Sequence, residues 1–197
     1  PQFVPSVFAA ENGETLATFY VPHNSSYTVI RSEQTFADIQ GRWAQNDIEL
    51  LANKLIVNGI GQNLFAPHDK VTRASFAAML VRSLGLTETA GATAFSDVSE
   101  DDWHAGALKT AYEVGLVYGD ENGAYGPDAP VTREQMASMT ARALEFAGKA
   151  PKNAAALERY VDVDDMAEWS KEAIAGLLAA GIAEGVDDRA FAPKEPA

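Results

Sequence analysis

Residues 95–103 read FSDVSEDDW, a short pattern in which an aromatic residue, a variable residue, aspartate and an aliphatic residue precede a tryptophan. The pattern occurs three times, as FADI (36–39) before Trp43, FSDV (95–98) before Trp103 and YVDV (160–163) before Trp169. The first two tryptophans are 60 positions apart, and the second and third are 66 apart. Further landmarks keep these offsets: Gly59, Gly119 and Gly185; Phe65, Tyr125 and Phe191; Pro67, Pro127 and Pro193. A period of this length indicates a repeat protein.

Each copy predicts a helix, a turn, a loop and a second helix. After each tryptophan, apolar residues recur at helical spacing: Ile48, Leu51 and Leu55; Leu108, Ala111 and Val114; Ile174, Leu177 and Leu178. Gly59, Gly119 and Gly185 are expected to end these helices. The second helix follows VTR at 71–73 and 131–133, where Thr72 and Thr132 are predicted N-caps and Gln135 completes a capping box. Its apolar residues are Phe76, Met79 and Leu80 in one copy and Met136, Met139 and Ala143 in the other.

The domain organisation follows from these copies. Repeats are predicted at 35–86, 94–147 and 159–197, the third truncated before its second helix, with linkers at 86–94 and 147–159. Residues 1–34 differ, because β-branched stretches at 15–21 and 27–30 and a turn signal at Asn12-Gly13 predict a small β segment that ends a preceding domain. One copy is too small to bury its apolar face, so the copies must pack on one another. The fold class is therefore mainly α.

Composition excludes several classes of function. The formal charge of −13, with 28 acidic and 15 basic residues, disfavours nucleic acid and anionic membranes as partners. No cysteine is present for a disulfide, a thiolate metal site or a nucleophile. No apolar run is long enough to cross a bilayer. Because the sequence starts without methionine and stops within a copy, we expect a fragment of a longer exported protein.

The combined motifs resemble the S-layer homology family over residues 36–197. The resemblance rests on Phe-x-Asp-Val before tryptophan, the glycine-containing turn, Phe/Tyr-x-Pro and Val-Thr-Arg at a helix start. It implies a pseudo-threefold, three-pronged spindle whose grooves bind a secondary cell-wall polymer, commonly through pyruvylated N-acetylmannosamine. It also implies a non-catalytic module at the cell surface of a Gram-positive bacterium. The family's Thr-Arg-Ala-Glu is here Thr-Arg-Ala-Ser (72–75) and Thr-Arg-Glu-Gln (132–135), so the final acidic residue is missing from both.

The candidate ligand-binding residues begin with two arginines. Arg73 and Arg133 follow the capping threonines, where a guanidinium can reach a groove beside helix N–H groups and grip a carboxylate through two hydrogen bonds. From the residues alone, an exposed arginine that is solvated or that bridges to an acidic side chain of the next repeat is an equally open reading. The resemblance favours binding, with the pyruvyl carboxylate as the partner.

The other candidates are aromatic or glycine. Trp43, Trp103 and Trp169 are expected either to stack on a sugar face or to pack in the core. Gly59, Gly119 and Gly185 allow backbone N–H groups to approach a ligand as well as ending helices.

Alternative functions have weaker support in the sequence. A calcium-dependent, dockerin-like protein–protein module is suggested by 120–123 and Asp187-Asp188, but Ala124 breaks the alternation of ligands that an EF-type loop needs. A structural or self-assembling domain remains open. Acidic residues such as Glu134 and Asp101-Asp102 are expected to be solvated rather than catalytic, and no metal site, cofactor or nucleophile motif is predicted.

Overall fold

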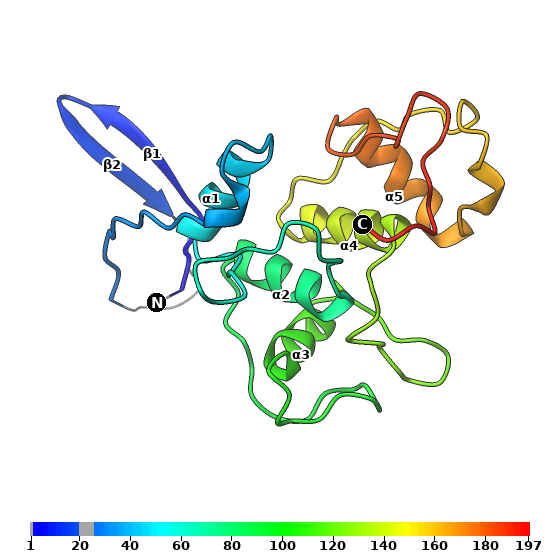
Figure 1. The fold of residues 1–197 in the computed structure, drawn as a ribbon, viewed down its shortest axis with the longest axis horizontal. Coiled ribbons are helices and arrows are strands. Elements are labelled where there is room, and N and C mark those ends of the chain that lie inside the picture. Colours follow the sequence, from blue (N-terminus) through cyan, green and yellow to red (C-terminus); the bar gives the residue numbers. More distant parts are fainter. Residues whose placement is uncertain (1, 20–25) are drawn as a thin grey trace. The chain divides into compact units, whose positions relative to one another are not determined.

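The computed structural model of the chain describes residues 2–19 and 26–197. By their internal contacts these residues form two units: Pro1–Asp69 with Arg82–Leu86, and Lys70–Val81 with Thr87–Ala197. Figure 1 follows the chain through both units.

The first unit begins with a β-hairpin. Strands β1 (Ser6–Glu11) and β2 (Glu14–Phe19) pair antiparallel, with Glu11 opposite Glu14. Asn12 and Gly13 have φ angles of 52° and 83°, as a two-residue turn with positive φ at both central positions requires. The predicted β segment and its turn are therefore confirmed, although Tyr20 and Val21 lie outside the described residues.

The prediction of a strand at residues 27–30 is wrong. Residues 27–30 form no strand, and Val29 is 77% exposed. β-branched residues favour a strand only where a neighbouring strand supplies backbone partners, and the described sheet has only β1 and β2.

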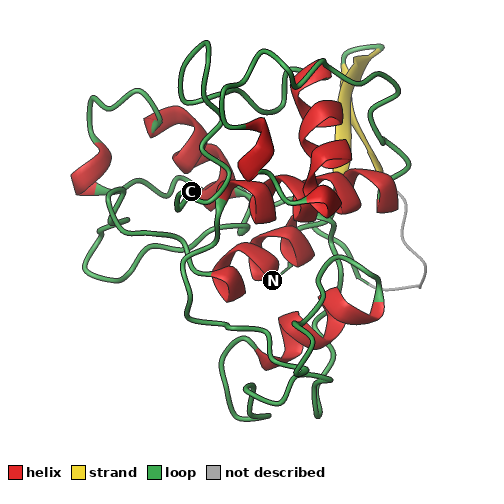
Figure 2. Ribbon diagram, turned by 90° about the vertical axis from the view of Figure 1, so that its right-hand side faces the viewer, coloured by secondary structure: helices red, strands yellow, loops and turns green. Residues whose placement is uncertain are grey.

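Helices make up the rest of the described regular structure, so the mainly α fold class is confirmed (Figure 2). The helices are η1 (Ala37–Ile39), α1 (Gln45–Asn53), α2 (Arg73–Ser83), α3 (Ala105–Glu113), α4 (Arg133–Phe146), η2 (Val163–Asp165) and α5 (Glu168–Ala179). The α1, α3 and α5 helices follow the three tryptophans or include one, and α2 and α4 follow the Thr-Arg motifs. The predicted capping box is present at the start of α4, where Thr132 and Gln135 each bond the other's backbone N–H.

The glycines predicted to end the first helices do not do so. These helices end several residues earlier, and the positive-φ positions after them are Leu55, Gly115 and Gly181. The repeated glycines instead permit a close approach of chain segments. A Cβ on Gly119 would lie 2.9 Å from the Ala124 carbonyl oxygen and 3.2 Å from the Phe95 ring. Comparable close contacts surround Gly59 and Gly185.

The predicted apolar faces are partly misplaced. Leu51 is exposed, and Leu55 lies beyond the end of α1. In α2 the most deeply buried residues are Ala74, Ala77, Ala78 and Val81 rather than the predicted larger side chains. Small residues let neighbouring segments approach closely, which a pattern based only on large apolar residues does not detect.

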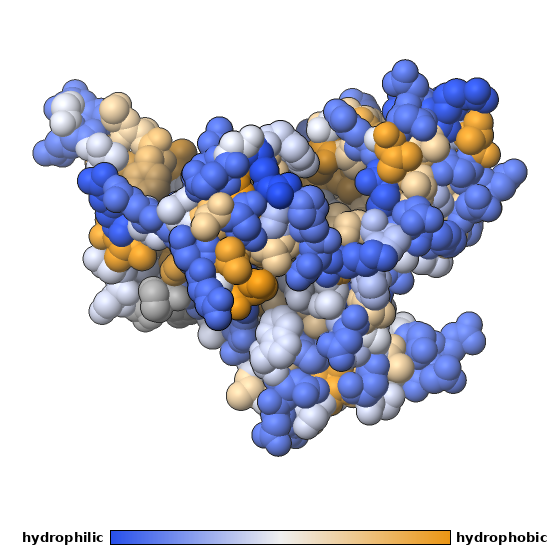
Figure 3. All heavy atoms as spheres, in the orientation of Figure 1, coloured by the Kyte–Doolittle hydropathy of each residue, from blue (hydrophilic) through white to orange (hydrophobic). Residues whose placement is uncertain are grey.

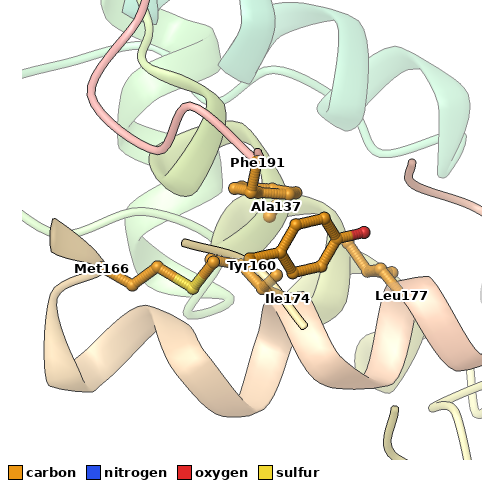
Figure 4. Packing of buried hydrophobic residues seen from close by; sticks show 6 residues of the cluster. All are labelled: Ala137, Tyr160, Met166, Ile174, Leu177 and Phe191. Atoms are coloured by element: carbon orange, nitrogen blue, oxygen red, sulfur yellow. The ribbon is translucent and has the colours of Figure 1, made fainter. Parts of the chain in front are cut away.

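The core of the second unit lies where α4 packs against α5. Tyr160 and Phe191 meet edge to face, with ring centroids 6.1 Å apart, and α5 contributes Ile174 and Leu177 (Figure 4). Tyr160 begins the third copy and Phe191 belongs to its loop, so both repeated aromatics are core residues.

Candidate functional site

The repeated aspartates fix the loop of their own copy. Both carboxylate oxygens of Asp97 accept backbone N–H bonds, from Tyr125 and Gly126, each at 2.8 Å. Asp38 and Asp162 accept corresponding bonds from the loops of their own copies. The N–H groups of Phe65 and Ala66 lower the pKa of Asp38. These aspartates thus hold the aromatic residue and proline of each loop in place.

Arg73, at the start of α2, docks on the loop of the second copy. Its Nε donates to the Tyr125 carbonyl oxygen at 2.8 Å, and its guanidinium lies 4.4 Å from the centre of the Tyr125 ring. The Tyr125 hydroxyl donates in return to the Arg73 carbonyl oxygen at 3.1 Å. Burial raises the pKa of Tyr125 to about 12, so this phenol stays protonated. Arg73 therefore contacts a backbone carbonyl and a ring, which neither reading from the sequence described.

Arg133 repeats this docking at the start of α4. Its Nε donates to the Phe191 carbonyl oxygen at 2.7 Å, and its guanidinium lies 4.8 Å from the Phe191 ring centre. A further bond runs from Nη2 to the Glu184 carbonyl oxygen at 2.6 Å. Arg133 is thus tied more firmly to its neighbouring loop than Arg73.

Backbone pairing accompanies each docked arginine. The Val131 N–H donates to Val71, and the Ala197 N–H donates to Val131, both at 2.9 Å. Isolated β-bridges join Thr72 to Pro130 and Thr132 to Pro196. The segment that starts each second helix is therefore paired with the equivalent segment of the next copy.

A groove of about 620 Å³ opens beside Arg73 within the second unit. Its lining includes Arg73, Gly119 and Trp169, so three of the eight predicted site residues share one groove. Trp169 is 56% exposed and lies on α5, the first helix of the next copy. The groove therefore brings together an arginine, a glycine turn and a tryptophan that are far apart in the sequence.

The other five predicted residues do not line this groove. Trp43 and Gly59 belong to the first unit, while Trp103, Arg133 and Gly185 are elsewhere in the second. Trp43 and Trp103 are 93% and 62% exposed. The reading of the tryptophans as core residues is therefore wrong for all three, because each is more than half exposed.

Arg142 and Tyr118 also line the groove and were not among the candidates from the sequence. Arg142 on α4 stacks over Tyr118, with its guanidinium 4.7 Å from the ring centre. A signal existed, because Arg82 stands 60 positions before Arg142 in the first copy. Tyr118 has no such signal, since Asn58 and Glu184 occupy its positions in the other copies.

The groove is lined by two arginines and two aspartates. Asp97 and Asp120 are its only acidic lining residues, and both accept backbone N–H bonds. Neither Arg73 nor Arg142 forms an ion pair with any side chain in the described part of the chain. Hydrophilic residues cover most of the face in Figure 3. The chain as a whole carries −13, whereas two arginines match two aspartates in the groove lining, so the groove departs from the general acidity of the protein.

Glu134 has a structural role, so the prediction that it is solvated is wrong. Only 4% of it is exposed, and its Oε2 accepts the Ala167 N–H at 3.0 Å, with the Ser170 hydroxyl 3.2 Å away. Lys194 forms an ion pair with the other carboxylate oxygen. Glu134, which lies on α4, thus accepts a hydrogen bond at the N-terminal end of α5, where backbone N–H groups have no partner within the helix.

The features that suggested calcium binding have another explanation. The Asp120 carboxylate accepts the N–H groups of Asn122 and Ala124, and Asp187 accepts those of Arg189 and Ala190. These are local turn contacts. Among the described residues no group of three or more metal-ligating side chains is present, and no helix is long and apolar enough to cross a membrane.

The repeats and the groove between consecutive copies define a class of tandem helical surface modules. The family model described as S-layer homology domain matches residues 35–77, 94–137 and 159–197, and the chain belongs to this family. The resemblance drawn from the motifs is confirmed. Members of the family are modules of cell-surface and S-layer proteins, which places this chain at the cell surface.

Three relatives illustrate where such modules occur. An amylopullulanase of Thermoanaerobacterium thermosulfurigenes is 34% identical over 90% of this chain and 10% of its own length. Exoglucanase XynX of Acetivibrio thermocellus is 35% identical over 84% of the chain and 15% of its own length. The S-layer protein sap of Bacillus anthracis is 28% identical over 85% of the chain and 20% of its own length. The chain therefore spans at most a fifth of each of these proteins and covers only their S-layer homology region.

Proposed function

We propose that this chain is a non-catalytic anchoring module that binds an acidic secondary cell-wall polymer in the groove beside Arg73. The proposal rests on the surroundings of the Arg73 guanidinium. Its guanidinium is oriented by Tyr125 and has no ion-pair partner among the described residues, although the protein as a whole is strongly acidic. An acidic group on a glycan can form direct, charge-assisted hydrogen bonds to the guanidinium nitrogens that the protein leaves free.

The neighbouring residues suit a sugar ligand. Trp169 offers an exposed apolar ring against which the C–H face of a sugar can lie. Gly119 leaves the backbone of the turn open to close approach, because it has no side chain. In this proposal the arginine binds the acidic group, the tryptophan contacts the sugar ring and the glycine leaves room for both.

The finer details of the proposal come from the family. The acidic unit is pyruvylated N-acetylmannosamine, and repeats at 35–86, 94–147 and 159–197 form a pseudo-threefold spindle with residues 1–34 ending a preceding domain. Arg133, Trp43, Trp103, Gly59 and Gly185 then belong to the equivalent grooves. The rest of the molecule is a larger exported protein of a Gram-positive bacterium. No observation favours a dockerin-like module or a purely structural role.

A binding assay on purified walls tests the proposal. We expect the chain to sediment with sacculi that retain their secondary polymer and to stay in solution with sacculi stripped of it by acid. Arg73→Ala should weaken binding about tenfold or more, and Arg73→Lys should restore little of it, because lysine cannot form two parallel bonds to a carboxylate. Equal binding to stripped sacculi would refute the proposal.

A matched control separates the groove from overall charge. Arg159 stacks on Tyr160 with its guanidinium 4.6 Å from the ring centre, as Arg73 stacks on Tyr125, but it does not line the groove. Arg159→Ala removes the same charge and should bind as the unmodified chain does. Equal losses in both variants would assign binding to net charge instead of to the groove.

A further inference from the structure

Arg142 is a second cation of the groove, on a different element from Arg73. It lies in the third turn of α4, whereas Arg73 starts α2. Each guanidinium stacks on its own tyrosine, Arg142 on Tyr118 at 4.7 Å and Arg73 on Tyr125 at 4.4 Å. The groove therefore contains two separately supported arginines.

Arg142 is held less tightly by the protein than Arg73. Its one recorded hydrogen bond runs from Nη1 to the Leu116 carbonyl oxygen at 3.4 Å, a long contact compared with the 2.8 Å bond of Arg73. Its remaining N–H groups have no protein acceptor among the described residues. The planar fork of Arg142 is thus available to a ligand.

Burial of Arg142 is not compensated by a carboxylate. The side chain is half-buried, and this burial lowers its pKa. A partly desolvated charge without a counter-ion is unfavourable, and an acidic ligand removes that cost. The acidic lining residues Asp97 and Asp120 form no ion pair with Arg142 in the described part of the chain.

We propose that Arg142 and Tyr118 form a second acidic-group subsite in the groove, so that the groove binds two acidic groups of one polymer chain, one at Arg73 and one at Arg142. This inference rests on the proposed function and adds to it a preference for polymer with acidic groups on neighbouring units. Carboxylates and phosphates share the required chemistry.

Calorimetric titration with polymer fragments tests the second subsite. The probes are a fragment with a single pyruvyl group, a fragment with two pyruvylated units, and poly(glycerol phosphate). We expect Arg142→Ala to lose about tenfold in affinity for the doubly pyruvylated fragment and nothing for the singly pyruvylated one. Arg142→Lys should retain part of the affinity, and Arg159→Ala is the matched control. A comparable loss for poly(glycerol phosphate) would extend the subsite to phosphate, and no loss would restrict it to carboxylate.

Combining the two substitutions distinguishes two subsites from one. If Arg73 and Arg142 hold different acidic groups, the losses in the double variant should multiply, and each substitution should reduce the salt dependence of binding. A double variant no worse than Arg73→Ala alone would mean that both arginines grip one group, which would overturn the inference. Melting temperatures of all variants identify any loss due to unfolding, and the lysine variant provides the comparison if the alanine variant does not fold.

Failure of the inference differs from failure of the proposed function. If the unmodified chain binds the fragments and Arg142→Ala binds the doubly pyruvylated one equally well, only the second subsite is wrong. If the unmodified chain binds none of the probes and no sacculi, the anchoring function is wrong and the inference falls with it.

Discussion

Two junctions in the molecule have the same backbone pairing but different side-chain contacts. One lies between α2 and the loop at 125–130, and the other lies between α4 and the loop at 191–196. In the first junction the Arg73 side chain makes one bond, to the Tyr125 carbonyl oxygen of the loop. In the second the Arg133 side chain makes two, one to the Phe191 carbonyl oxygen of the loop and one to the Glu184 carbonyl oxygen outside it. We call these the first and second junctions. The additional bond of Arg133 uses part of the guanidinium that in Arg73 remains available to the groove.

The two junctions also differ in the residue that follows each arginine. Ala74 in the first junction stands where the second has Glu134, and His104 stands where the second has Ser170. Glu134 and Ser170 meet and cap α5, whereas His104 is 5% exposed and neither ring nitrogen has a hydrogen-bond partner among the described residues. At these positions the second junction thus has a buried acceptor that receives hydrogen bonds, and the first has none. The same scaffold supports both because the backbone pairing is common to them.

The largest expected effect is at Glu134. Glu134→Ala should lower the free energy of unfolding by about 2–3 kcal/mol, because it leaves the Ala167 N–H without its buried charged acceptor and removes the ion pair with Lys194. Urea denaturation followed by circular dichroism measures the loss. Glu134→Gln keeps an acceptor and should lose less, and equal losses would show that the cap on α5 depends on the charge. An unchanged urea midpoint in Glu134→Ala would show that this buried contact does not make the second junction more stable than the first.

A smaller effect separates the two arginines. Arg133→Ala should cost about 1–2 kcal/mol and Arg73→Ala about half as much, because Arg133 makes the extra bond to Glu184. Polymer binding should follow the opposite order in the groove described here, with Arg73→Ala the more damaging. Both variants can be compared by urea denaturation and wall sedimentation. Identical stabilities would mean that the extra bond contributes nothing.

The smallest effect concerns pH. Partial burial raises the pKa of Asp97, but the N–H groups of Tyr125 and Gly126 and the charge of Arg73 outweigh it, so the folded pKa is lowered. The carboxylate therefore contributes stability above the unfolded value near 4, and this contribution is lost as the pH falls through the folded pKa. Between pH 6 and pH 3 the melting temperature should fall less in Asp97→Asn than in the unmodified chain. Asp101→Asn removes an exposed carboxylate nearby and should behave as the unmodified chain does.

The repeat period predicted much of the architecture because it constrains many positions at once. Three aligned copies were enough to locate the helices, the capping box at Thr132 and the family. The Asn12-Gly13 turn was predictable for a local reason, since few residues tolerate positive φ at two consecutive positions.

The contacts within the groove were predictable only in part. Arg73, Gly119 and Trp169 were candidates, but their neighbourhood depends on how one copy packs against the next, which no local pattern contains. The role of Gly119 was misread because its missing side chain matters for the Phe95 ring, 24 positions earlier in the chain, rather than for the preceding helix. Glu134 was misread because an acidic residue at a helix start is usually solvated, and only the packing of α5 buries it.

The short backbone ladder that pairs consecutive copies has a mechanical consequence. In the first junction it consists of the bonds from Val131 to Val71, from Arg73 to Ala129 and from Ala74 to Pro127. Val131 bonds to Val71, 60 positions earlier, and Ala197 bonds to Val131 in the same manner. When tension is applied along such a chain, the two junctions lie in series and carry the same load, so the weaker one is expected to release first. If the segment that a released junction closes also unfolds, it adds about 60 residues of chain, or roughly 200 Å when straightened. We therefore expect such a module to lengthen in separate steps under a pulling force.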